Sequence, residues 1–130
     1  MSVHTNLELL GRALERFRDS LNYSPDQPLV VDASIQRFEF CVELTWKTLK
    51  RALVLEGIEA NTPRECLQQA YVAHWLDDET LWLTMLRDRN LTSHTYREAL
   101  ALEIFSHLPS YLSAMTDLHA LLVLRFKSED

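Results

Sequence analysis

The chain has 130 residues and a formal net charge of −6, with 47% hydrophobic and 25% charged residues. This length suits one domain, expected to span residues 1–130, and the negative charge excludes nucleic-acid or membrane binding driven by overall charge alone. Only two glycines, together with an abundance of Leu, Ala, Glu and Arg, predict an all-α fold.

No segment has the pattern of a signal peptide or a membrane span, so we expect a cytoplasmic protein with no membrane partner. Cys41 and Cys66 lie in helical patterns and match no metal or redox spacing, which predicts reduced thiols in the core. His74, Asp77 and Asp78 are the nearest approach to a metal-binding group. They match no metal-ligand motif, so we expect neither a metal nor another cofactor.

The first predicted helix starts at a capping box formed by Thr5 and Glu8. The Ser-Pro and Gln-Pro pairs within residues 22–28 end it. Between them, apolar residues recur at steps of three and four, which indicates a surface helix with one buried face: Leu7, Leu10, Leu14, Phe17 and Leu21.

The second predicted helix is capped by Asp32 or Ser34 and lasts to about Glu56, with Gly57 as a left-handed stop. It is apolar on more than one side, because Phe40, Leu44 and Leu55 fall outside its main stripe. In a chain this small, we expect one of those sides to meet another subunit and form a homodimer. The main stripe consists of Ile35, Phe38, Val42, Leu49 and Leu53.

Thr62, Pro63 and Glu65 mark the clearest helix start in the chain, and this short helix is expected to last to about His74. Asp77 or Asp78 then caps a fourth helix that ends near Asn90.

Thr95 and Glu98 form a further capping box, which predicts a fifth helix from about Tyr96. Pro109 either kinks this helix or starts a sixth segment. Long amphipathic helices with short connections predict an up-and-down bundle, similar to a four-helix bundle with one short extra helix.

The segment of residues 85–96 reads M-L-R-D-R-N-L-T-S-H-T-Y and holds the densest run of reactive side chains. Arg89 supplies a permanent planar cation for phosphate oxygens, and His94 supplies a proton carrier near neutral pH. Asn90 can orient a ribose hydroxyl or the imidazole. In a purely structural reading, Arg89 pairs with a carboxylate and His94 merely precedes a helix. Spacing alone favours the structural reading.

Glu39, Glu43 and Lys47 follow one another at steps of one helical turn. Such a ladder usually stabilises a solvated helix face. Here it is also placed to line a cleft and hold Arg89. Three further histidines match no motif and are assigned no role: His4, His107 and His119.

The run R-N-L-T-S-H-T-Y, residues 89–96, resembles the signature of the HEPN superfamily. It is similar in particular to the branch called HepT, or nucleotidyltransferase substrate-binding proteins. The stretch I-Q-R-F-E-F-C-V-E-L-T-W-K-T-L-K, residues 35–50, resembles the same branch, as does the longer run of residues 82–96. Two separate motifs in the family's order make the resemblance specific.

The resemblance implies a dimer in which two Arg-x4-His motifs face a shared cleft and act as a metal-independent endoribonuclease. Such proteins are toxins whose antitoxin is a small nucleotidyltransferase encoded nearby. Carried over by residue, Arg89 binds RNA phosphate, His94 is the acid and base, and Asn90 assists. The alternative is a non-catalytic nucleotide- or substrate-binding subunit of a two-component nucleotidyltransferase.

The resemblance also implies that the nucleotidyltransferase transfers AMP to Tyr96. We expect this tyrosine in the first turn of a helix, beside His94, with its phenol reaching the cleft. The competing interpretation is that Tyr96 packs on the apolar stripe of Ala99, Leu102 and Phe105.

Overall fold

Three long helices and two short ones make up the protein, whose structure is a computed structural model that describes residues 2–127. No strand occurs within that range, which confirms the predicted all-α fold class. The helices and one 3-10 turn follow one another as α1 (Val3–Ser20), α2 (Pro28–Leu55), α3 (Pro63–Val72), α4 (Glu79–Leu91), η1 (Thr92–His94) and α5 (Glu98–Arg125).

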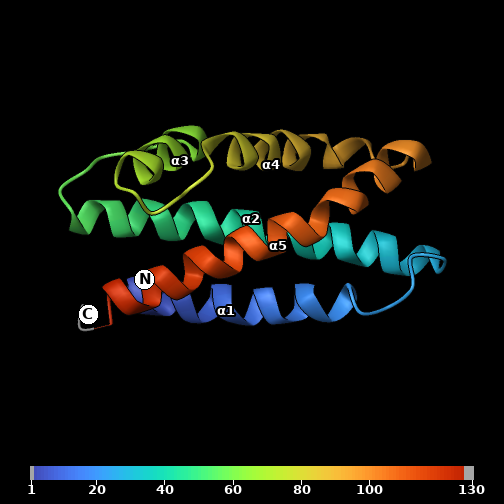
Figure 1. Cartoon of the computed structure of the whole chain (residues 1–130), viewed down its shortest axis with the longest axis horizontal. Coiled ribbons are helices and arrows are strands. Elements are labelled where there is room, and N and C mark those ends of the chain that lie inside the picture. Colours follow the sequence, from blue (N-terminus) through green and yellow to red (C-terminus); the bar gives the residue numbers. More distant parts are fainter. Residues whose placement is uncertain (1, 128–130) are drawn as a thin grey trace.

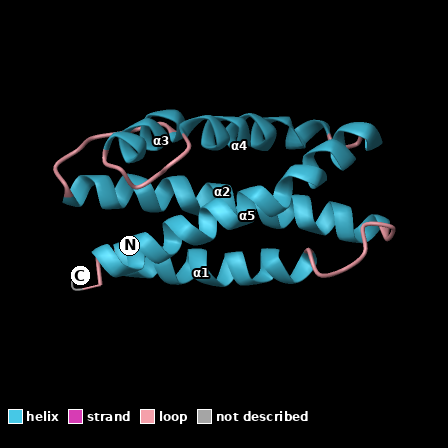
Figure 2. Cartoon of the chain, viewed as in Figure 1, coloured by secondary structure: helices cyan, strands magenta, loops and turns pink. Residues whose placement is uncertain are grey.

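The helices run up and down along the long axis of the molecule (Figure 1 and Figure 2). α1 and α2 run in opposite directions, α3 and α4 follow one another back along α2, and α5 returns across α2 towards the start of α1 (Figure 1). The short α3 and α4 therefore share the third arm of a four-armed bundle, as the sequence predicts. None of the helices within residues 2–127 is long and apolar enough to span a membrane.

The core lies where α1, α2 and α5 meet. Phe38 of α2 lies between Phe17 of α1 and Tyr111 of α5, with ring centroids 6.2 Å and 5.4 Å away. Burying a large side chain of this kind stabilises the fold by about 1.5–3 kcal/mol. The two predicted apolar stripes are buried, except that Leu21 is only partly covered.

The N-termini of α1 and α2 differ from the sequence prediction. α1 starts one residue after Ser2, whose side chain accepts the backbone N–H of Thr5, so the predicted box from Thr5 to Glu8 is wrong. Ser2 offers the same capping oxygen one turn earlier. α2 starts at Pro28, well before Asp32 and Ser34. Proline suits the first helical position because its fixed φ is already helical and its missing N–H is not needed there.

Three other helix ends agree with prediction. Gly57 has a φ of +77° after the end of α2, a left-handed conformation that a side chain would strain. Thr62 accepts the backbone N–H of Glu65 at 3.1 Å and starts α3. Asp78 caps α4 by accepting the backbone N–H of Leu81 at 3.0 Å.

The start of α5 also differs. The helix begins at Glu98, and no side chain caps it, so the predicted box from Thr95 to Glu98 is wrong. The Thr95 hydroxyl instead donates to the carbonyl of Thr92 at 2.8 Å and closes the η1 turn. α5 continues through the exposed Pro109 as one helix, and no sixth segment starts there.

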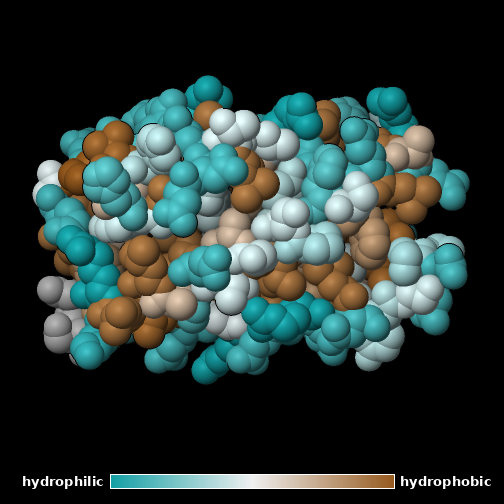
Figure 3. All heavy atoms as spheres, in the orientation of Figure 1, coloured by the Kyte–Doolittle hydropathy of each residue, from teal (hydrophilic) through white to brown (hydrophobic). Residues whose placement is uncertain are grey.

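Apolar side chains also reach the surface. On α2, Phe40 and Leu55 are each about half exposed, while Leu44 and Trp46 are partly buried against the core. Apolar patches cover part of the C-terminal half of α5 (Figure 3), where Leu124 is exposed. α2 thus has uncovered apolar side chains, but the homodimer stays a prediction.

Candidate functional site

Arg89 lies in the last turn of α4 and faces α2. Its Nη2 is 3.4 Å from Oε2 of Glu43, and the other oxygen of Glu43 is 3.5 Å from Nζ of Lys47. The Arg89 side chain is 37% exposed. Glu43 therefore fixes the guanidinium against α2 while part of it stays accessible to a ligand.

The turn after α4 is attached to α2 by Thr92, which sequence reasoning overlooked. Its buried hydroxyl lies 2.8 Å from Oε2 of Glu39 and 2.7 Å from the carbonyl oxygen of Arg89. One hydroxyl proton can serve only one of these acceptors at a time. Glu43 thus contacts Arg89, and Glu39 contacts Thr92. Both carboxylates of the predicted ladder therefore face the segment that joins α4 to η1.

His94 and Tyr96 project from the α4–α5 connection into solvent. The Tyr96 hydroxyl is 3.4 Å from Nδ1 of His94, and the rings meet edge to face with centroids 6.0 Å apart. Tyr96 is 80% exposed, so it does not pack on the stripe of α5. It lies in the turn before α5 and not in the first helical turn, because α5 starts only at Glu98.

The predicted residues thus gather where the end of α4 and the α4–α5 connection meet the middle of α2, but they do not all touch. Within residues 2–127, the Asn90 amide has no hydrogen-bond partner, and no hydrogen bond joins Arg89 to His94. The segment presents a half-buried cation, an exposed imidazole and an exposed phenol. These are groups that can bind a phosphate and move a proton.

A buried cluster next to Arg89 escaped the sequence analysis. The Asp88 carboxylate is 2% exposed and accepts the hydroxyl of Tyr111 at 2.5 Å and the Nδ1–H of His107 at 2.8 Å. Burial raises the pKa of Tyr111, and the bond to Asp88 raises it further, so the phenol stays a donor. The only sign of this cluster in the sequence is that His107 and Tyr111 lie one helical turn apart. No local pattern connects these two residues to Asp88.

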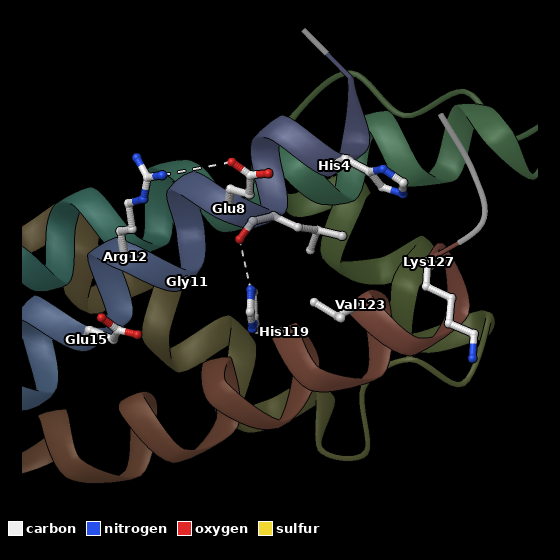
Figure 4. Close-up of a pocket in the computed structure, with 9 residues that line it drawn as sticks. His4, Glu8, Gly11, Arg12, Glu15, His119, Val123 and Lys127 are labelled. Atoms are coloured by element: carbon white, nitrogen blue, oxygen red, sulfur yellow. Dashed lines mark hydrogen bonds and ion pairs between the residues drawn. The ribbon is translucent and has the colours of Figure 1, made fainter.

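His119 and His4, two of the histidines that match no motif, hydrogen-bond to backbone carbonyls. His119 of α5 donates from Nε2 to the carbonyl of Leu7 at 2.9 Å, on the wall of a surface pocket of about 470 Å³ between α1 and α5 (Figure 4). Gly11 leaves room for this imidazole, since a Cβ there would lie 3.1 Å from its Nε2. His4 donates to the carbonyl of Phe126 at 2.6 Å. None of the predicted site residues lines this pocket.

Cys41 and Cys66 are buried free thiols, as predicted. Burial raises the pKa of Cys41 to about 12 and also raises the pKa of Cys66. Both groups are therefore protonated near neutral pH.

The site thus belongs to an all-α bundle, and its Arg-x4-His-x-Tyr segment runs from the last turn of α4 into the connection to α5. The chain belongs to the family described as nucleotidyltransferase substrate binding protein like, which matches residues 5–123. This confirms the family indicated by the resemblance of residues 35–50 and 82–96.

Individual relatives agree with the family. The chain is 29% identical over 128 residues to the probable ribonuclease HepT of Haemophilus influenzae, covering 86% of this chain and 88% of that protein. A crystal structure from Thermus thermophilus has a TM-score of 0.83 at 36% identity, covering 87% of this chain and 98% of that one. A Haemophilus influenzae structure, described as the substrate binding domain of a nucleotidyltransferase, has a TM-score of 0.81 at 25% identity, covering 89% and 98%.

Proposed function

We propose that the protein is a HEPN-type toxin, a metal-independent endoribonuclease held in check by a partner nucleotidyltransferase. The observation that carries this proposal is the placement of Arg89 and His94 on one short segment. Arg89 is held by Glu43 at 3.4 Å yet remains partly accessible, and His94 is exposed. The name of the Haemophilus influenzae relative, probable ribonuclease HepT, supports the same activity.

RNA can be cleaved here by its own 2′-hydroxyl. The 2′-oxygen bonds to the adjacent phosphorus while the bond from phosphorus to the 5′-oxygen breaks, which leaves a cyclic phosphate and a free 5′-hydroxyl. His94 takes the 2′-hydroxyl proton and returns a proton to the leaving oxygen. Arg89 binds the non-bridging oxygens as negative charge builds up on them, and Asn90 orients the ribose.

One chain provides one such arginine and one such histidine. A two-fold axis through the site would double both in a shared cleft. The half-exposed Phe40 and Leu55 on α2 give apolar surface for such contact. Light scattering at micromolar concentration should therefore give a dimer, and a strict monomer would contradict the shared cleft.

Tyr96 is the proposed switch. Its phenol oxygen bonds to the α-phosphorus of ATP, the bond to pyrophosphate breaks, and the phenol proton passes to solvent. The hydroxyl is 3.4 Å from His94, so the attached AMP places bulk and negative charge beside the proton carrier. RNA phosphate is then repelled, by the same physics as a regulatory phosphorylation.

The test is RNA cleavage in the presence of a chelator. The His94→Ala variant should lose about 100-fold or more of the rate, the usual contribution of a general acid or base. The His74→Ala variant, which changes an exposed histidine beyond the end of α3, should cleave normally. Cleavage that survives His94→Ala, or that needs magnesium, would refute this assignment.

The switch is tested by intact-mass spectrometry after incubation with ATP, magnesium and the neighbouring nucleotidyltransferase. Mass steps of AMP should appear on the wild-type protein and vanish in Tyr96→Phe. Tyr71→Phe removes another exposed phenol and should be modified normally. Steps that persist in Tyr96→Phe would exclude Tyr96 as the acceptor.

The second candidate is a non-catalytic subunit that presents a nucleotide or an acceptor to a nucleotidyltransferase. The family description, nucleotidyltransferase substrate binding, favours it. Arg89 would then still bind phosphate, but His94→Ala would leave function intact. Growth of cells expressing the chain alone separates the two, because only the ribonuclease should slow growth.

A further inference from the structure

Two surface pockets adjoin at Thr95, next to Tyr96. The first, of about 800 Å³, lies between the start of α2 and the start of α5, and Tyr96 lines it. The second, of about 500 Å³, continues along α2 from Leu29 to Glu39. Asp32 and Thr95 line both pockets, so the two adjoin along these residues, and together they are here called the acceptor groove.

The acceptor groove is acidic. Every charged side chain that lines it is a carboxylate, and none is basic: Asp26, Asp32, Glu39 and Glu98. Glu39 accepts a hydrogen bond from Thr92, whereas the other three have no ion-pair partner within residues 2–127. Uncompensated negative charge repels an RNA backbone and attracts a cationic surface.

Exposed apolar side chains border the same groove. Leu29 at the start of α2 is 80% exposed, and Leu102 on α5 is 48% exposed. Together with the exposed ring of Tyr96, they lie on both sides of the depression. Single exposed leucines are ordinary. An apolar group surrounded by unpaired charges of one sign is instead what a protein interface uses, with apolar anchors inside a polar rim.

The groove is distinct from the proposed ribonuclease groups. Neither Arg89 nor His94 lines it. The two surfaces adjoin at Thr95, at Tyr96 and at Glu39, which accepts a hydrogen bond from Thr92. A transferase that modifies Tyr96 must bring its active site to the phenol oxygen. Its surface around that active site must therefore cover the residues around the phenol.

We infer that the acceptor groove is the docking surface for the partner nucleotidyltransferase, which fits it with basic and apolar side chains. This inference rests on the proposed modification of Tyr96. The docking of a basic partner also explains why carboxylates line a depression next to a site that, in the proposed function, binds the negatively charged RNA. The enzyme approaches from the acidic side, and RNA approaches from the side of Arg89.

The experiment measures binding and modification separately. Calorimetry without ATP gives the Kd of the purified transferase for this protein, and AMP incorporation at varied protein concentration gives KM and kcat. The variants are Asp32→Lys and Leu29→Ser. Their matched controls are Asp117→Lys and Leu124→Ser, which alter an exposed carboxylate and an exposed leucine elsewhere on α5.

Asp32→Lys should raise Kd and KM about tenfold or more, because it reverses a steering charge. Leu29→Ser should raise both about fivefold or more, as expected for the loss of an apolar anchor. kcat and the cleavage of RNA by unmodified protein should stay as in the controls. This combination supports the docking surface.

Other results would overturn it. If wild-type Tyr96 is modified and both variants match their controls, the docking surface is wrong and the switch stands. If the wild-type protein neither binds the transferase nor receives AMP, both proposals fail. A change of oligomeric state in the variants would assign the groove to a second copy of this chain. A change confined to the KM for RNA would assign it to RNA.

Discussion

Asp88 links α4 to α5, and its replacement by alanine has a calculable effect. The carboxylate accepts the Tyr111 hydroxyl at 2.5 Å and the His107 ring at 2.8 Å. Asp88→Ala leaves the Tyr111 hydroxyl, which is 1% exposed, without a partner. Such an orphaned group costs about 1–3 kcal/mol. Since the other partners of Asp88, His107 and Arg87, are partly exposed and can bond to water, we expect a loss of about 1–3 kcal/mol.

Urea unfolding followed by circular dichroism measures this loss, and a double-mutant cycle shows whether the cluster causes it. Tyr111→Phe removes the hydroxyl but keeps the ring that stacks on Phe38. Asp88→Ala combined with Tyr111→Phe should destabilise less than the sum of the two single changes, because no hydroxyl is then orphaned. Asp117→Ala, an exposed control, should stay within about 0.5 kcal/mol of wild type. Additive effects, or an Asp88→Ala loss below about 1 kcal/mol, would refute the reasoning.

Two further predictions concern stability. Burial raises the pKa of Cys41 from 9.0 to about 12, so above pH 9 the unfolded chain loses a proton that the folded chain keeps. The stabilisation from this thiol is full below pH 9, and above pH 9 the free energy of unfolding should fall by about 1.4 kcal/mol per pH unit. Urea unfolding at several pH values should show this slope in the wild-type protein and a smaller slope in Cys41→Ala. Thr62→Ala removes the cap of α3 and should cost about 1 kcal/mol, whereas Thr80→Ala, at an exposed position in α4, should cost less. Equal costs would contradict the capping role.

The sequence predicted the helices well because their buried faces recur with the helical period. The apolar stripes of α1 and α2 are buried as expected, and the end of α2 falls at the glycine that permits a positive φ. The starts of α3 and α4 also agree, but those of α1, α2 and α5 were predicted wrongly. Near the starts of α1 and α2, several residues of suitable chemistry follow one another within a few positions. α1 is capped by Ser2 instead of Thr5, and α2 starts at Pro28 instead of near Asp32 or Ser34.

In the candidate site, too, the features that depend on neighbouring residues could be predicted from the sequence, and the contacts between distant residues could not. The order of Arg89, His94 and Tyr96 is a local pattern that the sequence displays. The groups that hold this segment come from far along the chain. Thr92 bonds to Glu39 across 53 residues, and Asp88 bonds to Tyr111 across 23. Only the packing of α4 against α2 and α5 brings these partners together, so the hydrogen bonds could not be inferred from spacing.

The run R-D-R, residues 87–89, shows how one helical turn separates roles that look alike in the sequence. Successive residues of an α-helix point about 100° apart. Arg87 is therefore 65% exposed, Asp88 is 2% exposed against α5, and Arg89 is 37% exposed against α2. If Arg89 binds RNA phosphate, Arg89→Ala should weaken binding and cleavage, while Arg87→Ala removes the same charge from a different face and should do neither. Equal losses from both changes would mean that the total positive charge of this helix end matters, and not the placement of Arg89 by Glu43.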